Sequence, residues 1–161
     1  MSGNHKIIKL IKSQSMIKIY FCGSIRGGRD LAEKYGQIIK MLQNFGTVLT
    51  EHIADKDIIE KEAENQTDEE IYLQDRNWLE ESDIVIAEVT TPSLGVGFEI
   101  GYAIRMKKPI LCLYNNDADF DLSAMISGCP DLSVVKYQQT GELRAAVEKF
   151  IYNNSIKSVR L

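Results

Sequence analysis

Residues 17–28 read IKIYFCGSIRGG and decide the fold class. The first six are rich in β-branched and aromatic side chains, which is typical of a buried strand, and Gly23 ends the run. The glycine-rich turn that follows leads into a stretch with apolar residues at helical spacing, which ends at about residues 44–46. A strand, a tight glycine turn and a helix in this order predict the start of an alternating α/β chain.

The same alternation continues along the rest of the sequence. Residues 54–68 are charged and lack periodicity, so we expect a loop or short helical pieces there. Further strands are expected at 47–50, 84–87, 109–114 and 132–135, and helices at about 68–81, around Glu99 and at about 142–151. We therefore predict an α/β fold: a single doubly wound, Rossmann- or flavodoxin-like domain with a five-stranded parallel sheet. Such folds bind ligands at the C-terminal ends of the strands.

The composition is that of a soluble globular protein. The 161 residues include 19 Lys and Arg against 23 Asp and Glu, and the net charge of −4 argues against a nucleic-acid partner. No apolar run approaches the length of roughly 20 residues that spans a bilayer, so no membrane partner is expected. We expect a flexible N-terminal tail at 1–15, a domain at 16–153 and a C-terminal tail at 154–161.

The three cysteines form no CxxC pair, so neither a disulfide framework nor a zinc site is indicated. Cys22 and Cys112 lie in apolar runs and are interpreted as small core residues. A reducing compartment follows, and we expect a cytoplasmic protein, with the nucleus as a second compartment. With only two histidines, a metal site is not expected, and no motif indicates a cofactor.

The glycine-rich turn after the first strand is a candidate phosphate site. Glycines let backbone N–H groups approach an anion, the helix that follows adds its positive dipole end, and Arg26 can donate two hydrogen bonds. The pattern is neither a P-loop nor a GxGxxG fingerprint. The alternative is a tight strand-to-helix turn that binds nothing.

A second loop, PSLGVGFE at residues 92–99, leads into the helix around Glu99. Ser93 is suited to cap that helix. Gly95 and Gly97 each cost about 1 kcal/mol of helix stability, so we expect something to approach the turn closely. Glu99 follows about one turn into the helix, facing the strand ends. The alternative for Glu99 is a carboxylate that only favours the helix dipole.

Asp75 supplies a second carboxylate in the middle of the helix at about 68–81, on the same face as Trp78. Its alternative role is a solvated side chain paired with Arg76 or Arg26. Two carboxylates that converge on one pocket are the minimal apparatus of glycoside chemistry, and the hydroxyl of Tyr20 would point to the same place. The residues alone thus predict a nucleotide-handling enzyme without naming it.

Several segments resemble the 2′-deoxynucleoside 5′-phosphate N-hydrolases (the Rcl family), within the wider nucleoside 2-deoxyribosyltransferases. The two longest are YFCGSIRGGR at 20–29 and PSLGVGFEIG at 92–101. The others are residues 45–52, 74–75, 78–79, 87–90 and 122–126. The resemblance covers most of the expected domain, from about residue 17 to about residue 150.

This resemblance implies hydrolysis of the N-glycosidic bond of 2′-deoxynucleoside 5′-monophosphates to free base and 2-deoxyribose 5-phosphate. Glu99 would be the nucleophile and form a covalent glycosyl intermediate. Asp75 would be the general acid toward the leaving base and then help to activate water, and Tyr20 would orient Glu99 or stabilise the sugar. A retaining reaction of this kind implies carboxyl groups about 5–5.5 Å apart.

The resemblance also implies a substrate site and a homodimer with shared active sites. Residues expected to bind the phosphate and sugar are Gly23, Ser24, Ile25, Arg26, Gly27, Gly28, Arg29, Ser93 and Gly95, with Tyr35 lining the same pocket. Ser123, Ala124 and Met125 would reach the phosphate in the neighbouring subunit's site, although Ser123 can also be read as a plain helix cap. Phe98 stands where the family usually has a tyrosine, so one hydroxyl contact is missing.

Three alternatives remain open at this point. A nucleoside 2-deoxyribosyltransferase would pass the sugar to a second base, and Ser24, Arg26 and Ser93 speak against it because unphosphorylated nucleosides need no phosphate grip. A nucleotide-binding module would hold the same ligand without turnover, and it is disfavoured because both Asp75 and Glu99 are present. The third alternative is a chain that binds only a partner protein, with these loops as caps and turns.

Overall fold

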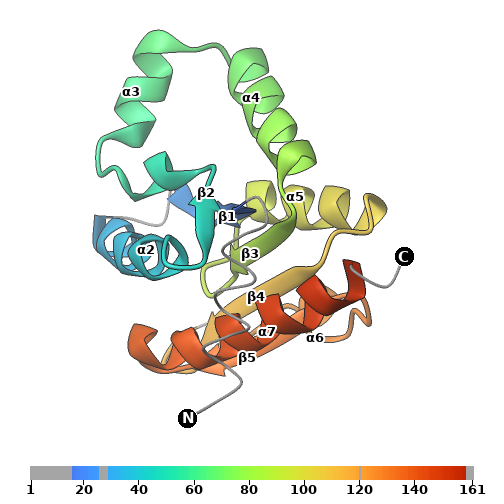
Figure 1. Cartoon of the computed structure of the whole chain (residues 1–161). Helices are drawn as coiled ribbons and strands as arrows, with labels where there is room; N and C mark the ends of the chain where they lie inside the picture. Colours follow the sequence, from blue (N-terminus) through green and yellow to red (C-terminus); the bar gives the residue numbers. More distant parts are fainter. Residues whose placement is uncertain (1–15, 26–28, 120, 159–161) are drawn as a thin grey trace.

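The computed structural model describes residues 16–25, 29–119 and 121–158, and its core is a sheet of five parallel strands (Figure 1). The strands are β1 (Ile17–Cys22), β2 (Gly46–Val48), β3 (Ile84–Glu88), β4 (Ile110–Asn115) and β5 (Ser133–Tyr137). Their order is β2-β1-β3-β4-β5, and every neighbouring pair is parallel. The predicted fold class, a doubly wound α/β domain with five parallel strands, is confirmed.

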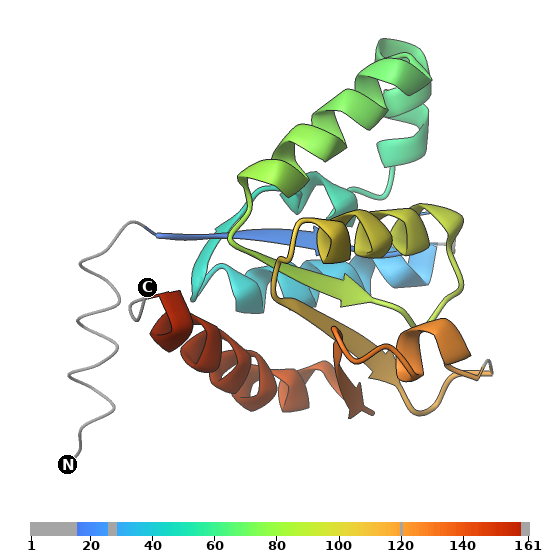
Figure 2. The same ribbon diagram turned by 90° about the vertical axis from the view of Figure 1, so that its right-hand side faces the viewer.

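Helices cover both faces of the sheet (Figure 2). They are α2 (Arg29–Leu42), α3 (Ile58–Asn65), α4 (Asp68–Glu81), α5 (Leu94–Arg105), α6 (Ala124–Ser127) and α7 (Leu143–Ser158), with 3-10 turns η2 (Glu51–Ala54) and η3 (Thr140–Glu142). α2 and α7 pack on one face, where Ile38 and Val147 meet Ile19 and Ile86. α5 and the end of α4 pack on the other. The strands read as nearly continuous apolar runs because both faces are buried.

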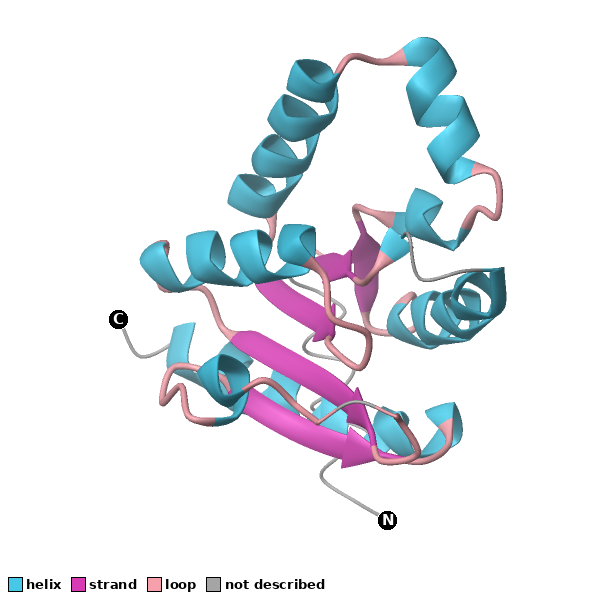
Figure 3. Ribbon diagram, turned by 180° about the vertical axis from the view of Figure 1, so that it is seen from behind, coloured by secondary structure: helices cyan, strands magenta, loops and turns pink. Residues whose placement is uncertain are grey.

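Residues 54–68, for which we expected a loop or short helical pieces, contain short helical pieces. η2 and α3 lie there, and α4 follows after a capping box in which Thr67 and Glu70 exchange hydrogen bonds of 3.3 and 2.8 Å. α3 and α4 rise away from the sheet and are joined at their far ends by a short loop (Figure 3). We call this pair of helices, residues 58–81, the arch.

At the C-terminal end of the chain, α7 continues past residue 153 as far as Ser158. Residues 1–15, for which we expected a tail, lie outside the described part of the chain. Within the described ranges, no helix combines the length and the apolar character that crossing a membrane requires.

β2 lies on one side of β1 in the sheet and β3 lies on its other side. β1 and β3 are therefore neighbours at the topological switch point. Their pairing brings Cys22 opposite Ala87 at the C-terminal ends. Thr50, just beyond β2, fixes the same edge: its hydroxyl accepts a hydrogen bond from the Phe21 N–H at 3.0 Å and donates one to the Phe21 carbonyl at 2.5 Å. The loops that follow β1 and β3 therefore meet over a rigid edge.

Replacement of Thr50 by Val should destabilise the protein by about 2–3 kcal/mol, because it leaves the buried N–H and C=O of Phe21 without their partner. The measurement is urea unfolding followed by circular dichroism. Thr47→Val is the matched control, since Thr47 is exposed on β2, and it should be neutral or slightly stabilising. Equal stabilities for the two variants would contradict this account of Thr50.

Candidate active site

A cleft of about 500 Å³ opens at the carboxyl ends of β1 and β3. It collects side chains from β1, the turn after β1, η2, α4 and the start of α5, so it lies where the fold predicts a ligand site. Eight of the residues singled out in the sequence line it: Tyr20, Gly23, Ser24, Ile25, Asp75, Ser93, Gly95 and Glu99. The sheet and α5 thus bring the two candidate carboxylates into one cavity.

Glu99 lies deep in this cleft on α5 and has two neighbours on β1. The Tyr20 hydroxyl donates a hydrogen bond of 2.6 Å to Glu99 Oε1, and the Cys22 thiol also hydrogen-bonds to this carboxylate. Burial raises the pKa of Glu99 to about 7, because desolvation disfavours the charged form more than the two hydrogen bonds favour it. The same burial, together with the charge of Glu99, raises the pKa of Tyr20 far above its usual range, so Tyr20 stays a donor.

Asp75 reaches the cleft from α4, across from α5. Arg76 does not neutralise it, since Arg76 pairs with Glu80 one turn along the helix at 3.4 Å. Burial raises the pKa of Asp75 to about 6, and the nearby charge of Glu62 on α3 raises it further in the same direction. Among the described residues no cation forms an ion pair with Asp75, and a half-buried carboxyl group of this kind is suited to carry a proton near neutral pH. The separation of about 5–5.5 Å from Glu99 stays a prediction.

The two carboxyl groups have raised pKa values near neutral pH. The charge of Asp75 contributes to the raised pKa of Glu99, after desolvation. Glycosidic bond cleavage requires one anionic and one protonated carboxyl group facing the same cavity.

The turn after β1 packs tightly against α2. A Cβ on Gly23 would lie 2.6 Å from Cζ of Tyr35, so only glycine fits under that ring. The Tyr35 hydroxyl donates a long hydrogen bond of 3.4 Å to the carbonyl of Ser24, so Tyr35 supports the turn from beneath. Of the remaining predicted phosphate ligands, Arg26, Gly27 and Gly28 lie outside the described residues, and so does the side chain of Arg29, the first residue of α2.

The loop before α5 begins with the expected cap. The Ser93 hydroxyl accepts a hydrogen bond from the Val96 N–H at 3.4 Å. We expected something to approach Gly95 and Gly97 closely, but no part of the described chain does so. A Cβ on Gly95 would make only an ordinary contact with Ser93 Oγ, and one on Gly97 would meet nothing within 4 Å. The space beside Gly95 is the cleft itself, and the space beside Gly97 belongs to a neighbouring groove.

That groove, of about 470 Å³, lies between α5 and α6 and contains Ser123 and Met125. The Ser123 hydroxyl caps α6 through the Met125 N–H at 3.3 Å, and Ala124 is the first residue of the helix. The three residues predicted to reach a phosphate therefore do not line the cleft of their own chain. Met125 is 81 % exposed, and Leu94 at the border between cleft and groove is 98 % exposed.

Three residues that border Glu99 or Asp75 were not predicted from the sequence as part of the site. Cys22 is a core residue, as expected, and it also contacts Glu99; the sequence could have indicated this contact, because side chains two apart on a strand share a face and Tyr20 was already assigned to the site. His52 packs on Trp78 with ring centroids 5.0 Å apart. With Asp75, these two rings border a second cavity of about 450 Å³ under the arch.

Replacement of Glu99 by Gln should stabilise the folded chain at alkaline pH. The folded-state pKa of about 7 lies above the usual 4.5, so the folded protein binds this proton more tightly and loses stability as the pH rises through 7. The amide removes that penalty while its oxygen can still accept from Tyr20. The expected gain is on the order of 3 kcal/mol at pH 8 and shrinks toward pH 5.

The measurement is chemical unfolding of both proteins between pH 5 and 8. Glu33→Gln serves as the control, because Glu33 is exposed on α2 and does not line the cleft. A gain for Glu99→Gln that is the same at pH 5 and pH 8 would show that the carboxylate is not held in the environment described.

The family model and the similar proteins found by comparison agree on one family. The family model for nucleoside 2-deoxyribosyltransferase matches residues 19–150. A 5-hydroxymethyl-dUMP N-hydrolase of Tetraodon nigroviridis is 47 % identical over 140 residues, covering 85 % of this chain and 99 % of that protein. The human 5-hydroxymethyl-dUMP N-hydrolase is 46 % identical over 136 residues, covering 82 % and 78 %.

Among solved structures, the Clostridium botulinum CMP N-glycosidase BcmB shares the fold, with a TM-score of 0.55 and 17 % identity over 83 % of this chain and 98 % of that one. The resemblance drawn from the sequence is confirmed by the relatives at higher identity. On the family match and on these relatives, the chain belongs to the nucleoside 2-deoxyribosyltransferase family, in the branch that contains the deoxynucleoside monophosphate N-hydrolases.

Proposed function

We propose that this chain is an N-glycosidase that hydrolyses 2′-deoxynucleoside 5′-monophosphates to free base and 2-deoxyribose 5-phosphate. The observation that carries the proposal is the pair of half-buried carboxyl groups, Asp75 and Glu99, that line one cleft with raised pKa values. The names of its relatives support the reaction class, since both relatives described above are N-hydrolases of a deoxynucleotide.

The proposed reaction has two steps and proceeds with retention, as the family resemblance implies. The Glu99 carboxylate attacks C1′ of the deoxyribose, and a C1′–O bond forms as the C1′–N bond breaks. Asp75 donates its proton to the leaving base. Water then attacks C1′ and passes a proton to the Asp75 carboxylate, which releases the sugar from Glu99. The Tyr20 hydroxyl, which hydrogen-bonds to Glu99 Oε1, orients the nucleophile.

The turn after β1 and the cap of α5 are the proposed holders of the 5′-phosphate. Both present backbone N–H groups at the start of a helix, where an anion is favoured. Ser24 and Ser93 line the cleft, and the space beside Gly95 that no described side chain occupies leaves room for the ligand. Phosphate binding energy at this remote end would position C1′ over Glu99.

The cavity under the arch is the proposed site of the base. It adjoins the cleft through His52 and Asp75, so a base leaving C1′ would lie beside the proton donor. Trp78 and His52 offer aromatic surface for stacking, and the amide groups of Gln66 and Gln74 are polar edges for recognition.

We also propose that the active enzyme is a homodimer in which α6 of each subunit completes the site of the other. The groove between α5 and α6 carries the exposed apolar side chains of Leu94 and Met125, which a second copy would cover. Ser123 and Met125 line this groove rather than the cleft of their own chain. The open space at Gly97 allows a second backbone to approach α5 closely.

A deoxyribosyltransferase is the alternative that the family leaves to be tested, because a transferase and a hydrolase differ only in what attacks the glycosyl intermediate. Water does so in the proposed reaction, and a free base would do so in the alternative. Adding excess adenine or cytosine to the reaction separates the two, since diversion of the sugar into a new nucleotide would support the transferase.

The wild-type protein should release free base from deoxynucleoside 5′-monophosphates and not from matched ribonucleotides or unphosphorylated deoxynucleosides. Glu99→Ala should abolish release because it removes the nucleophile. Asp75→Asn should lower the rate by about 10²–10⁴-fold because it removes general-acid catalysis. Chromatographic detection of the base between pH 5 and 9 gives the measurement, and a bell-shaped profile with flanks near the pKa values of Asp75 and Glu99 is expected.

Release that survives in Glu99→Ala would mean that Glu99 is not the nucleophile. Binding of monophosphates without any release would instead identify a nucleotide-binding module. Glu60→Ala is a matched control, since Glu60 is exposed on α3 and does not line the cleft, and it should leave the rate unchanged.

Replacement of Met125 by Glu should convert the dimer into monomers, because it places a charge in the apolar surface that the second copy buries. Base release should fall together with dimerisation. Light scattering coupled to size-exclusion chromatography reports the mass, and Ile59→Glu, on an exposed apolar residue of α3, is the control. A fully active wild-type monomer would contradict the shared site.

A further inference from the structure

A fully buried carboxylate, Glu88, lies on the face of the sheet opposite to Glu99. It is the last residue of β3 and is 0 % exposed. Because side chains alternate along a strand, Glu88 shares the α2–α7 face with Ile84 and Ile86, whereas Tyr20 lies on the face that carries α5. Glu88 has no part in the chemistry proposed above.

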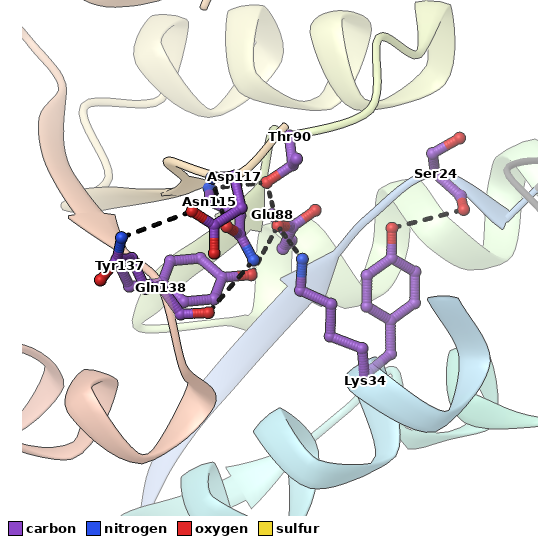
Figure 4. Close-up of polar contacts among 9 residues, drawn as sticks. Ser24, Lys34, Glu88, Thr90, Asn115, Asp117, Tyr137 and Gln138 are labelled. Atoms are coloured by element: carbon purple, nitrogen blue, oxygen red, sulfur yellow. Dashed lines mark hydrogen bonds and ion pairs between the residues drawn. The ribbon is translucent and has the colours of Figure 1, made fainter. Parts of the chain in front are cut away.

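Three groups converge on one oxygen of this carboxylate (Figure 4). The Tyr137 hydroxyl donates to Oε1 at 2.8 Å, the Thr90 hydroxyl donates to the same atom, and the Lys34 ammonium lies 3.2 Å from it. The Lys34 ammonium also stands 5.0 Å from the ring centre of Tyr137. No residue in the described ranges donates a hydrogen bond to Oε2.

A buried ion pair of this kind is a poor device for stability alone. Removing both charges from water costs several kcal/mol, and an apolar side chain of similar size often packs as well or better. The carboxylate instead holds several elements in a fixed arrangement, because its partners come from separate parts of the fold. Lys34 belongs to α2, Thr90 to the loop after β3 and Tyr137 to the end of β5. The cluster therefore fixes how these elements sit at the carboxyl edge of the sheet.

Two of those elements flank the proposed phosphate site. Lys34 precedes Tyr35, whose ring packs on Gly23 in the turn after β1. Thr90 begins the loop that leads to Ser93, and its hydroxyl also accepts from the Asn115 N–H at 2.9 Å, which ties this loop to β4. Glu88 thus contacts Lys34, next to the Tyr35 that supports the turn after β1, and Thr90, in the loop after β3. It does not line the cleft itself.

We propose that Glu88 is a positioning residue that sets the spacing between the turn after β1 and the loop after β3, and through it the affinity for the 5′-phosphate. The inference rests on the proposed function, because it assigns both loops to phosphate binding. It predicts a defect in binding rather than in chemistry, since Tyr20 and Glu99 lie on the other face of the sheet.

The test compares Glu88→Gln with the wild type in base release and in calorimetric binding of 2-deoxyribose 5-phosphate. Gln keeps the shape and one acceptor oxygen but removes the charge that pairs with Lys34. KM and the Kd for 2-deoxyribose 5-phosphate should each rise by about tenfold or more, while kcat changes by less than about threefold. Lys34→Met should reproduce this pattern, and Lys34→Arg, which retains the ion pair, should stay close to the wild type.

Ser82→Ala is the control for loss of stability. Ser82 lies just before β3, at the end of the strand remote from the cleft, and its buried hydroxyl donates to the Leu79 carbonyl at 2.8 Å. This variant should lower the melting temperature and leave KM unchanged. A fall in kcat at constant KM for Glu88→Gln, or KM changes that simply follow the melting temperatures of all the variants, would overturn the proposal.

If Glu88→Gln does not fold, the comparison of Lys34→Met with Lys34→Arg decides the same question: a raised KM in the first alone supports the proposal, and equal values overturn it. The failure of the proposed function has a different signature. In that case the wild type itself releases no base, whereas failure of the present inference leaves wild-type release intact and KM insensitive to Glu88 and Lys34.

Discussion

The pairing of β1 with β3 is the constraint on which the rest of the molecule depends. Parallel hydrogen bonding sets Tyr20 opposite Val85 and Cys22 opposite Ala87, so the two strands end at the same level. The loop after β1 and the loop after β3 therefore lie next to each other, and each loop leads into a helix. Tyr20 on one strand and Glu99 on the helix after the other meet only because of this register.

The two sides of the paired strands carry different kinds of polar chemistry. On the α5 side, Glu99 and Asp75 are half-buried, no cation in the described ranges forms an ion pair with either, and desolvation raises the pKa of both. On the α2 side, Glu88 has Lys34 as a counter-charge and two hydroxyl donors. The carboxyl groups on the α5 side are therefore suited to proton transfer, and Glu88 on the α2 side is suited to holding its neighbouring elements in place.

Much of this could be predicted from the sequence because it depends on local patterns. The apolar strands, the glycine turn, and the Ser93 cap with Glu99 one turn beyond it follow from periodicity and capping rules. The contact of Cys22 with Glu99 was missed because a cysteine in an apolar strand has the same pattern whether or not it faces a cavity. The two glycines at 95 and 97 predicted a close neighbour, yet the neighbour is not part of the described chain.

Contacts between distant segments could not be predicted because no local rule encodes them. Nothing near Glu88 in the sequence indicates that Lys34 and Tyr137 will contact it. Residues 87–90, which contain Glu88, entered the sequence analysis only as part of the family resemblance. The position of α3 was equally hidden, since a charged segment without periodicity can be a loop or short helices. The helix expected at about 68–81 is confirmed as α4, and the capping box at Thr67 marks where it begins.

The arch has a consequence for how this scaffold can change. α4 is anchored in the core by Leu79 at its last turn, whereas Tyr72 and Leu73 nearer its start are exposed. The part of the cavity wall that α3 and α4 supply is largely polar, with Lys61, Gln66 and Gln74 among its residues, and these side chains lie outside the core clusters that pack on the sheet. Substitutions there carry little folding cost, so this wall can diverge among relatives, or be grafted from one to another, while the carboxylates below it stay in place.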